Sequence, residues 1–194
     1  MEKKKTAPTV GILALQGSVI EHESMLRKIG VNTLRVLKPE HLEQIDGIIL
    51  PGGESTTLGK LLKLFSLAEP LKTKIESGMP VFGTCAGLIL LAKEIEGEQP
   101  HLGTMDIKVR RNAYGRQIDS FIAHEVIEEF SPLPLELVFV RAPAIEKTFG
   151  KAKVLKELNG RIIAARQNNM LVTSFHPELT DDETVHRYFI SMIK

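Results

Sequence analysis

Val81–Leu91 reads VFGTCAGLILL, in which an apolar strand and an apolar helix are joined by a tight turn that holds the single cysteine, Cys85. The pattern Gly83-x-Cys85-x-Gly87 is the thiol form of the G-x-S-x-G nucleophile elbow, and its glycines relieve crowding at a sharp turn. We expect an exposed sulfur beside free backbone N–H groups, which favour a thiolate and can hold an oxyanion. The alternative is a buried cysteine that acts as a small hydrophobic residue.

Length and composition indicate one globular domain. The 194 residues are enough for a full hydrophobic core, and 43% of them are hydrophobic and 25% charged. A net charge of +1 argues against nucleic-acid binding through a broad basic face. One cysteine excludes an internal disulfide and fits a reducing, cytoplasmic setting. Because no apolar run approaches the roughly 18 residues that span a bilayer, we expect no membrane association.

Strand and helix patterns alternate in the first half of the chain. We expect residues 1–8 to be a flexible polar tail and residues 9–194 to form the domain. Continuous apolar runs predict strands at 9–15, 32–37, 47–50 and 80–82. Helical patterns lie at 19–29, 38–44, 56–65, 67–77 and 86–95. This alternation predicts a parallel sheet covered on both faces.

The second half contains short strand patterns separated by turn residues. They lie at 107–109, 120–122, 137–140, 154–155, 161–166 and 170–175. Asn159-Gly160 predicts a hairpin, and a last helix is expected from about Asp181 to Ile193, capped by Thr180 or Asp181. The whole is therefore predicted to be a single-domain, three-layer α/β fold, an open sheet with a parallel core and a mixed or antiparallel extension.

His176 and Glu178 can supply the base that a thiol needs near neutral pH. His176 follows the apolar run 170–175, so we expect it at the sheet edge where the elbow also opens. Pro177 stiffens the link and can hold the carboxylate of Glu178 against the imidazole, which fixes the tautomer facing sulfur. The alternative is a solvated histidine and glutamate in a loop. The sequence contains no cluster with metal-ligand spacing, so no metal is expected.

Pro51-Gly52-Gly53 ends the strand at 47–50. Two glycines let the backbone turn and present N–H groups, and we expect one oxyanion donor from Gly53 and one from Ala86. The alternative is an ordinary turn in which Ser55 or Thr56 caps the next helix.

Two basic positions and one glutamine also stand near strand ends. An arginine of the pair Arg110-Arg111, or Arg141, can clamp a substrate carboxylate, or each can form surface ion pairs. Gln16 can contact a ligand or a partner, or cap the following helix.

In combination, these segments resemble the class I, triad-type glutamine amidotransferases. More narrowly, the chain from about Val10 onward is similar to the glutaminase subunits of pyridoxal 5′-phosphate synthase, the PdxT family. Ala113-Tyr114 departs from the Ser-Phe of that family. The segments that match are Leu15-Gln16-Gly17, Pro51–Thr57, Gly83–Leu88, Arg111-Asn112 with Gly115-Arg116-Gln117, Arg141-Ala142-Pro143 and Phe175–Leu179.

The resemblance implies a flavodoxin-like fold and a triad of Cys85 as nucleophile, His176 and Glu178. It implies hydrolysis of L-glutamine to glutamate and ammonia without a cofactor. The partner it implies is the PdxS-type synthase subunit, a (β/α)₈ barrel, in an assembly of twelve copies of each chain, with Gln16 at the interface. The glutamine-binding residues it implies are Gly53, Glu54, Ser55, Arg111, Val140 and Arg141.

Two other interpretations remain open. One is an amidotransferase subunit that feeds a different acceptor, such as the imidazole glycerol phosphate pathway. The other is a non-enzymatic cysteine sensor or chaperone, or an inactive regulatory subunit, against which the position of Glu178 beside His176 argues.

Overall fold

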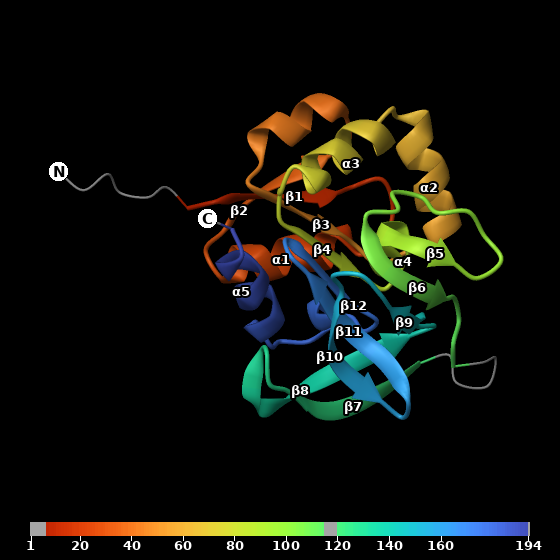
Figure 1. Cartoon of the computed structure of the whole chain (residues 1–194). Coiled ribbons are helices and arrows are strands. Elements are labelled where there is room, and N and C mark those ends of the chain that lie inside the picture. The colour runs from red at the N-terminus through yellow and green to blue at the C-terminus, as the bar shows by residue number, and fades with distance from the viewer. Residues whose placement is uncertain (1–6, 115–119, 194) are drawn as a thin grey trace.

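The computed structural model describes residues 7–114 and 120–193 (Figure 1), so most of the expected tail and the segment Gly115-Arg116-Gln117 lie outside the described residues. The strands in the described residues are β1 (Thr9–Leu13), β2 (Asn32–Val36), β3 (Gly47–Leu50), β4 (Val81–Thr84), β5 (Ala92–Ile95), β6 (Met105–Arg110), β7 (Ser120–Ile127), β8 (Ser131–Val140), β9 (Ala144–Thr148), β10 (Lys153–Leu158), β11 (Arg161–Gln167) and β12 (Met170–Thr173). The helices are α1 (Val19–Lys28), α2 (Ser55–Leu64), α3 (Ala68–Glu76), α4 (Ala86–Leu91) and α5 (Thr184–Ser191), with 3-10 turns η1 (Pro39–Gln44) and η2 (Pro177–Leu179).

The parallel half of the main sheet has the strand order β2-β1-β3-β4-β12. Neighbours in this series all run parallel, as the alternating pattern of the first half predicts. The order 2-1-3-4-5 is that of flavodoxin-like folds, in which ligands bind outside the carboxyl ends of the strands. The sheet therefore places the residues that follow β1, β3, β4 and β12 along one edge.

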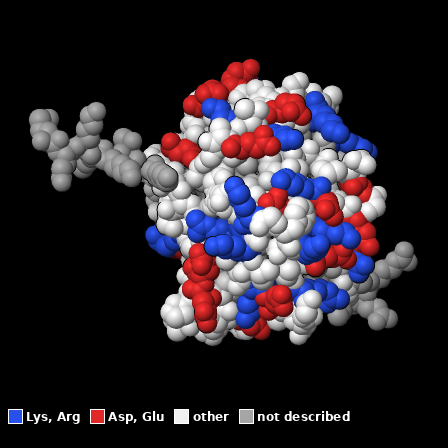
Figure 2. All heavy atoms as spheres, viewed as in Figure 1, with Lys and Arg blue, Asp and Glu red and all other residues white. Residues whose placement is uncertain are grey.

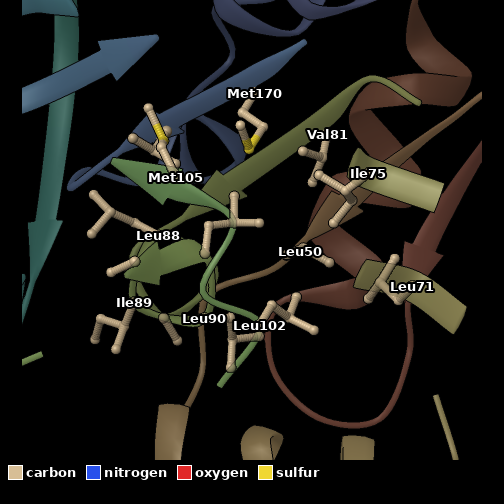
Figure 3. Packing of buried hydrophobic residues seen from close by; sticks show 14 of the residues in the cluster. Leu50, Leu71, Ile75, Val81, Leu88, Ile89, Leu90, Leu102, Met105 and Met170 are labelled. Atoms are coloured by element: carbon tan, nitrogen blue, oxygen red, sulfur yellow. The ribbon is translucent and has the colours of Figure 1, made fainter. Parts of the chain in front are cut away.

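Helices cover both faces of this sheet, and alternate side chains of each strand serve the two layers. Ile48 and Leu50 belong to the core beneath α2, α3 and α4, whereas Ile49 belongs to the core beneath α1 and α5. Figure 3 shows the first core, in which Leu50, Leu71 and Val81 meet side chains from β6, α4 and β12. Because both faces are buried, these strands read as continuous apolar runs.

The other half of the sheet is mostly antiparallel, which confirms the predicted extension. β11 pairs antiparallel with β12 and β10, and Asn159-Gly160 forms the turn of the β10–β11 hairpin as predicted. β7 and β8 form a separate two-stranded sheet, drawn at the bottom of Figure 1. The strand β9, which pairs with β6 and β11, was not predicted.

The helix predicted at 86–95 is wrong in its second half. α4 ends at Leu91, and Ala92 has the extended angles φ −61° and ψ 135°. Residues 92–95 form β5, which pairs parallel with β6. The apolar run 86–92 is compatible with helix or strand, and pairing with β6 overrides the local helical preference.

The last helix begins later than predicted, at Thr184. The expected cap residue Thr180 instead accepts a hydrogen bond from the Asp182 N–H at 3.2 Å. The Asp182 carboxylate accepts from the Thr184 N–H at 2.8 Å. These polar side chains therefore form a turn that precedes α5, which is a common competitor of helix for Thr and Asp.

The surface is mixed in charge. On the face shown in Figure 2, acidic and basic side chains alternate without a broad patch of either sign, which agrees with the net charge of +1. No helix of the described residues is long and apolar enough to cross a membrane.

Candidate active site

Four parallel strands end beside one cavity of about 490 Å³. β1 is followed by Gln16, β3 by Gly52-Gly53, β4 by Cys85 and β12 by His176. The cavity thus lies where the strand order reverses, at the carboxyl edge of the sheet. It brings together almost all the predicted site residues, namely Gln16, Gly53, Glu54, Ser55, Cys85, Ala86, Arg111, Val140, Arg141 and His176.

Cys85 lies at the turn between β4 and α4 in a conformation that few L-residues adopt, with φ 48° and ψ −102°. The two flanking glycines make this turn possible. A Cβ on Gly83 would lie 2.6 Å from the carbonyl carbon of Gly87, and a Cβ on Gly87 would lie 2.0 Å from the carbonyl oxygen of Leu50. Backbone strain held in place by such close packing is a feature of nucleophile elbows.

The sulfur is less exposed than the sequence analysis predicted. Cys85 is only 7% exposed, and its Sγ lies 3.9 Å from the carbonyl oxygen of Val140, the last residue of β8. It nevertheless lines the cavity together with His176. Cys85 is therefore neither an exposed thiol nor a core residue, but a thiol at the wall of an enclosed site.

His176 connects Cys85 to Glu178. The backbone N–H of His176 donates a hydrogen bond to the carbonyl oxygen of Val138 in β8 at 2.8 Å. This bond fixes the position of His176 after the end of β12. Its ring Nδ1 lies 2.7 Å from Glu178 Oε1. Burial opposes a charge on His176, but its interactions with Cys85 and Glu178 outweigh this effect and raise the pKa of His176 to about 10. The imidazole and the carboxylate of the predicted triad are thus in contact, and the thiol lines the same cavity as His176.

Glu178 is held as an anion although it is only 5% exposed. The Ser18 hydroxyl donates to its Oε1 at 2.7 Å, beside the bond from His176. Burial raises the pKa of Glu178, but the facing imidazoles of His22 and His176 and the Ser18 hydroxyl lower it to about 2. Neither Ser18 nor His22 was identified from the sequence. The only local sign is that both lie on the first turns after β1.

The peptide between Gly52 and Gly53 is fixed from the β1 side. The Ser18 N–H donates to the Gly52 carbonyl oxygen at 3.0 Å, and a Cβ on Gly17 would lie 1.8 Å from that oxygen. In a trans peptide the Gly53 N–H points away from this carbonyl. Gln16 Oε1 accepts a hydrogen bond from the Glu54 N–H at 2.9 Å. Gln16 therefore stabilises the position of the loop that follows β3.

Glu54, rather than Ser55 or Thr56, caps α2. Its carboxylate accepts from the Thr56 N–H at 3.1 Å and from the Thr57 N–H at 2.8 Å. Burial raises the pKa of Glu54, but the bonds from Thr57 and Thr56 and the charge of Arg111 lower it to about 2. Ser55 is buried at the cavity wall, and its hydroxyl has no hydrogen-bond partner in the part of the chain that the structure describes.

Arg111 is already paired within the protein. One terminal nitrogen lies 2.8 Å from Glu54 Oε1, and the other lies 3.1 Å from Glu98 Oε2 and 2.8 Å from Thr56 Oγ1. Arg111 therefore fits both interpretations from the sequence: it forms ion pairs within the protein, and its guanidinium lies at the wall of the cavity, where a substrate carboxylate could bind. Arg141 also lines the cavity, is exposed, and has φ 42°.

Comparison with known proteins identifies the family. The model of the SNO glutamine amidotransferase family matches residues 12–194. The chain belongs to the SNO glutamine amidotransferase family. A member from Carboxydothermus hydrogenoformans, named pyridoxal 5′-phosphate synthase subunit PdxT, is 58% identical over 95% of this chain and 97% of its own. A protein of the same name from Clostridium beijerinckii is 56% identical over 93% of this chain and 96% of its own.

A solved structure agrees with this membership of the SNO family. It is described as a crystal structure of glutamine amidotransferase, is 43% identical, and superposes with a TM-score of 0.90 over 95% of this chain and 98% of that one. The elbow, the parallel core and the antiparallel extension derived above are therefore those of a glutamine amidotransferase fold.

Proposed function

We propose that the protein hydrolyses L-glutamine to glutamate and ammonia and delivers the ammonia to the synthase subunit of pyridoxal 5′-phosphate synthase. The observation that supports this most directly is the series Cys85, His176 and Glu178 at the carboxyl edge of the sheet, in a member of an amidotransferase family. The relatives named as synthase subunits match nearly the whole chain.

In the first step, the Cys85 thiolate attacks the side-chain amide carbon of glutamine, and the carbonyl oxygen becomes an oxyanion. Backbone N–H groups of Gly53 and Ala86 donate to this oxyanion; Ala86 is the first residue of α4, where no intrahelical acceptor exists for its N–H. The tetrahedral intermediate collapses when its C–N bond breaks. His176 gives its proton to the departing nitrogen, which leaves as ammonia.

In the second step, neutral His176 takes a proton from water, and the hydroxide formed attacks the γ-glutamyl thioester. Collapse of this second intermediate breaks the C–S bond and releases glutamate and the Cys85 thiolate. Glu178 remains ionised throughout and stabilises the imidazolium form of His176, which is present before the first step and forms again in the second.

The wall of the cavity suits the charged end of glutamine. Arg111 and Arg141 offer guanidinium groups for the α-carboxylate, and Glu54 offers a carboxylate for the α-ammonium. Ser55, Val140 and Gly53 complete the site as backbone and hydroxyl partners. A binding role of this kind explains why the buried Ser55 hydroxyl lacks a partner in the described part of the protein.

The proposed partner is a PdxS-type (β/α)₈ barrel, in an assembly of twelve copies of each chain. Ammonia is protonated in bulk water and loses its nucleophilicity, so a sheltered transfer to the acceptor site is favoured. Gln16 lies exposed at the mouth of the cavity, where it is available to a partner as well as to the Glu54 N–H. A thiolate nucleophile suits the reducing cytoplasm.

The deciding experiment uses the chain in complex with the synthase subunit. Cys85→Ala is expected to abolish formation of glutamate from glutamine, because loss of a nucleophile lowers kcat by orders of magnitude. The same complex supplied with ammonium should still form pyridoxal 5′-phosphate. Substantial glutamine turnover by Cys85→Ala would refute the role of Cys85. Failure of the wild-type pair to use glutamine, while it uses ammonium, would refute the proposed function.

A further inference from the structure

Two histidines lie completely buried behind Glu178, outside the cavity. His22 of α1 and His186 of α5 are each 0% exposed. His22 Nδ1 lies 2.9 Å from His186 Nε2, and His22 Nε2 lies 3.2 Å from Thr84 Oγ1 and 3.5 Å from Glu178 Oε1. This row of side chains runs from α5 to the carboxylate of the proposed triad, and the proposed reaction uses neither histidine.

Both imidazoles are neutral at physiological pH. Burial lowers the pKa of His22 below 6.5, although the Glu178 carboxylate acts in the opposite direction. Burial likewise lowers the pKa of His186 to about 3. Each ring therefore has one N–H donor and one bare nitrogen, and the position of each hydrogen decides which contacts are favourable.

The neighbours of the pair select one arrangement of these hydrogens. With a proton on Nε2, His22 donates toward Glu178 and Thr84, and its bare Nδ1 accepts from His186. The opposite tautomer would direct the His22 Nε2 lone pair at a carboxylate. It would also leave a buried N–H at His186 Nδ1, an atom with no partner in residues 7–114 and 120–193. An unpaired buried donor is more costly than an unpaired aromatic lone pair.

We propose that His22 is a positioning residue of the triad, whose Nε2–H, in a tautomer fixed by His186, is directed at Glu178 Oε1 across 3.5 Å and at Thr84 Oγ1 across 3.2 Å. Together with the Ser18 hydroxyl and His176, it directs its donor at the same atom, Oε1. Oε2 has no hydrogen-bond partner in the described part of the chain. The convergence on one oxygen fixes the rotation of the carboxylate and so the direction of the His176 ring. This inference rests on the proposed glutaminase function.

The first test compares two substitutions at position 22 in the complex with the synthase subunit. His22→Leu removes the donor, and we expect kcat to fall about tenfold, as for loss of a hydrogen bond to a charged group, with KM changed less than about threefold. His22→Gln keeps an N–H donor, and we expect it to restore kcat to within about threefold of wild type. Phe189→Leu is the matched control for a loosened core, because the Phe189 ring packs against Phe82, which in turn packs against both histidines.

The pH profile separates positioning from a merely structural role. Loss of a donor raises the pKa of Glu178, so the acid limb of kcat/KM should move to higher pH in His22→Leu, by up to about one unit for a tenfold effect. It should not move in Phe189→Leu. The titratable groups that face this carboxylate or its partners are His22 and Glu21 of α1, Cys85, His176, and His186 of α5.

A spectroscopic test needs no variant at all. In ¹⁵N-histidine-labelled wild-type protein, the ring nitrogens of His22 should show a protonated Nε2 and a bare Nδ1 at neutral pH. A protonated Nδ1, or equal activity of His22→Leu and wild type, would overturn the inference while the glutaminase function stands. If the wild-type complex fails to use glutamine while it uses ammonium, the proposed function itself fails, and the two failures are thereby distinguished.

Discussion

Gly87 approaches Leu50 so closely that a Cβ on Gly87 would lie 2.0 Å from the Leu50 carbonyl oxygen. The contact joins the first turn of α4, which lines the cavity, to the end of β3, which leads into the cavity-lining residues Gly52 and Gly53. It therefore sets the distance between the elbow that holds Cys85 and the loop that holds Gly53.

The first prediction concerns this contact. Gly87→Ala should reduce the free energy of unfolding by about 3 kcal/mol or more, the upper end of the range for overpacking, because the obstacle is backbone. Gly160→Ala is the matched control. Gly160 has φ 73° and open space around it, so the substitution should cost only the left-handed penalty of about 1–2 kcal/mol. Urea denaturation measures both, and equal losses would contradict the close approach.

The second prediction concerns Ser18, which contacts the proposed site through two different groups. Its backbone N–H donates a hydrogen bond to the Gly52 carbonyl oxygen, and its hydroxyl donates one to Glu178 Oε1. Ser18→Ala removes only the hydroxyl, so kcat for glutamine should fall about tenfold with little change in KM. Ser24→Ala, at an exposed position of α1, which begins one residue after Ser18, should leave both constants unchanged. A rise in KM without loss of kcat would indicate that Ser18 binds substrate instead.

The third prediction separates two neighbouring arginines. Arg111→Ala should raise KM for glutamine by about tenfold or more, because it removes a guanidinium from the cavity wall and frees Glu54. Arg110→Ala should not change KM, since Arg110 is exposed and pairs with Glu96 and Glu146. Steady-state kinetics of the complex test both variants, and equal effects would place Arg111 outside the binding site.

The sequence predicted those parts of the site that follow from local patterns. Each of these patterns spans only a few consecutive residues: the elbow around Cys85, the strand end before His176, and the glycines after β3. The strand order 2-1-3-4-5 then brings the three segments together. Ser18 and Glu178 meet across 160 positions of sequence, and nothing local marks such a contact. The change from α4 to β5 was missed for a similar reason, because distant pairing with β6 determines it.

The final prediction concerns acid stability. The pKa of Glu178 is about 2 in the folded protein against 4.5 for an ordinary glutamate. Its ionisation therefore stabilises the fold fully above about pH 4.5, and this contribution is lost as the pH falls toward 2. Glu178→Gln has no carboxylate to protonate at this position. Between pH 4.5 and pH 2, wild type should therefore lose roughly 3 kcal/mol more of its free energy of unfolding than the variant does.

Urea midpoints measured between pH 5 and 2 test this directly. Glu54→Gln is the informative comparison: the pKa of Glu54 is also about 2, but its side chain is 47% exposed, so solvent screens its interactions and the corresponding shift should be smaller. A difference between wild type and Glu178→Gln that stays constant across this range would show that the carboxylate is not held as an anion. The donors that converge on Oε1, from Ser18, His22 and His176, would then lack the acceptor that orders them.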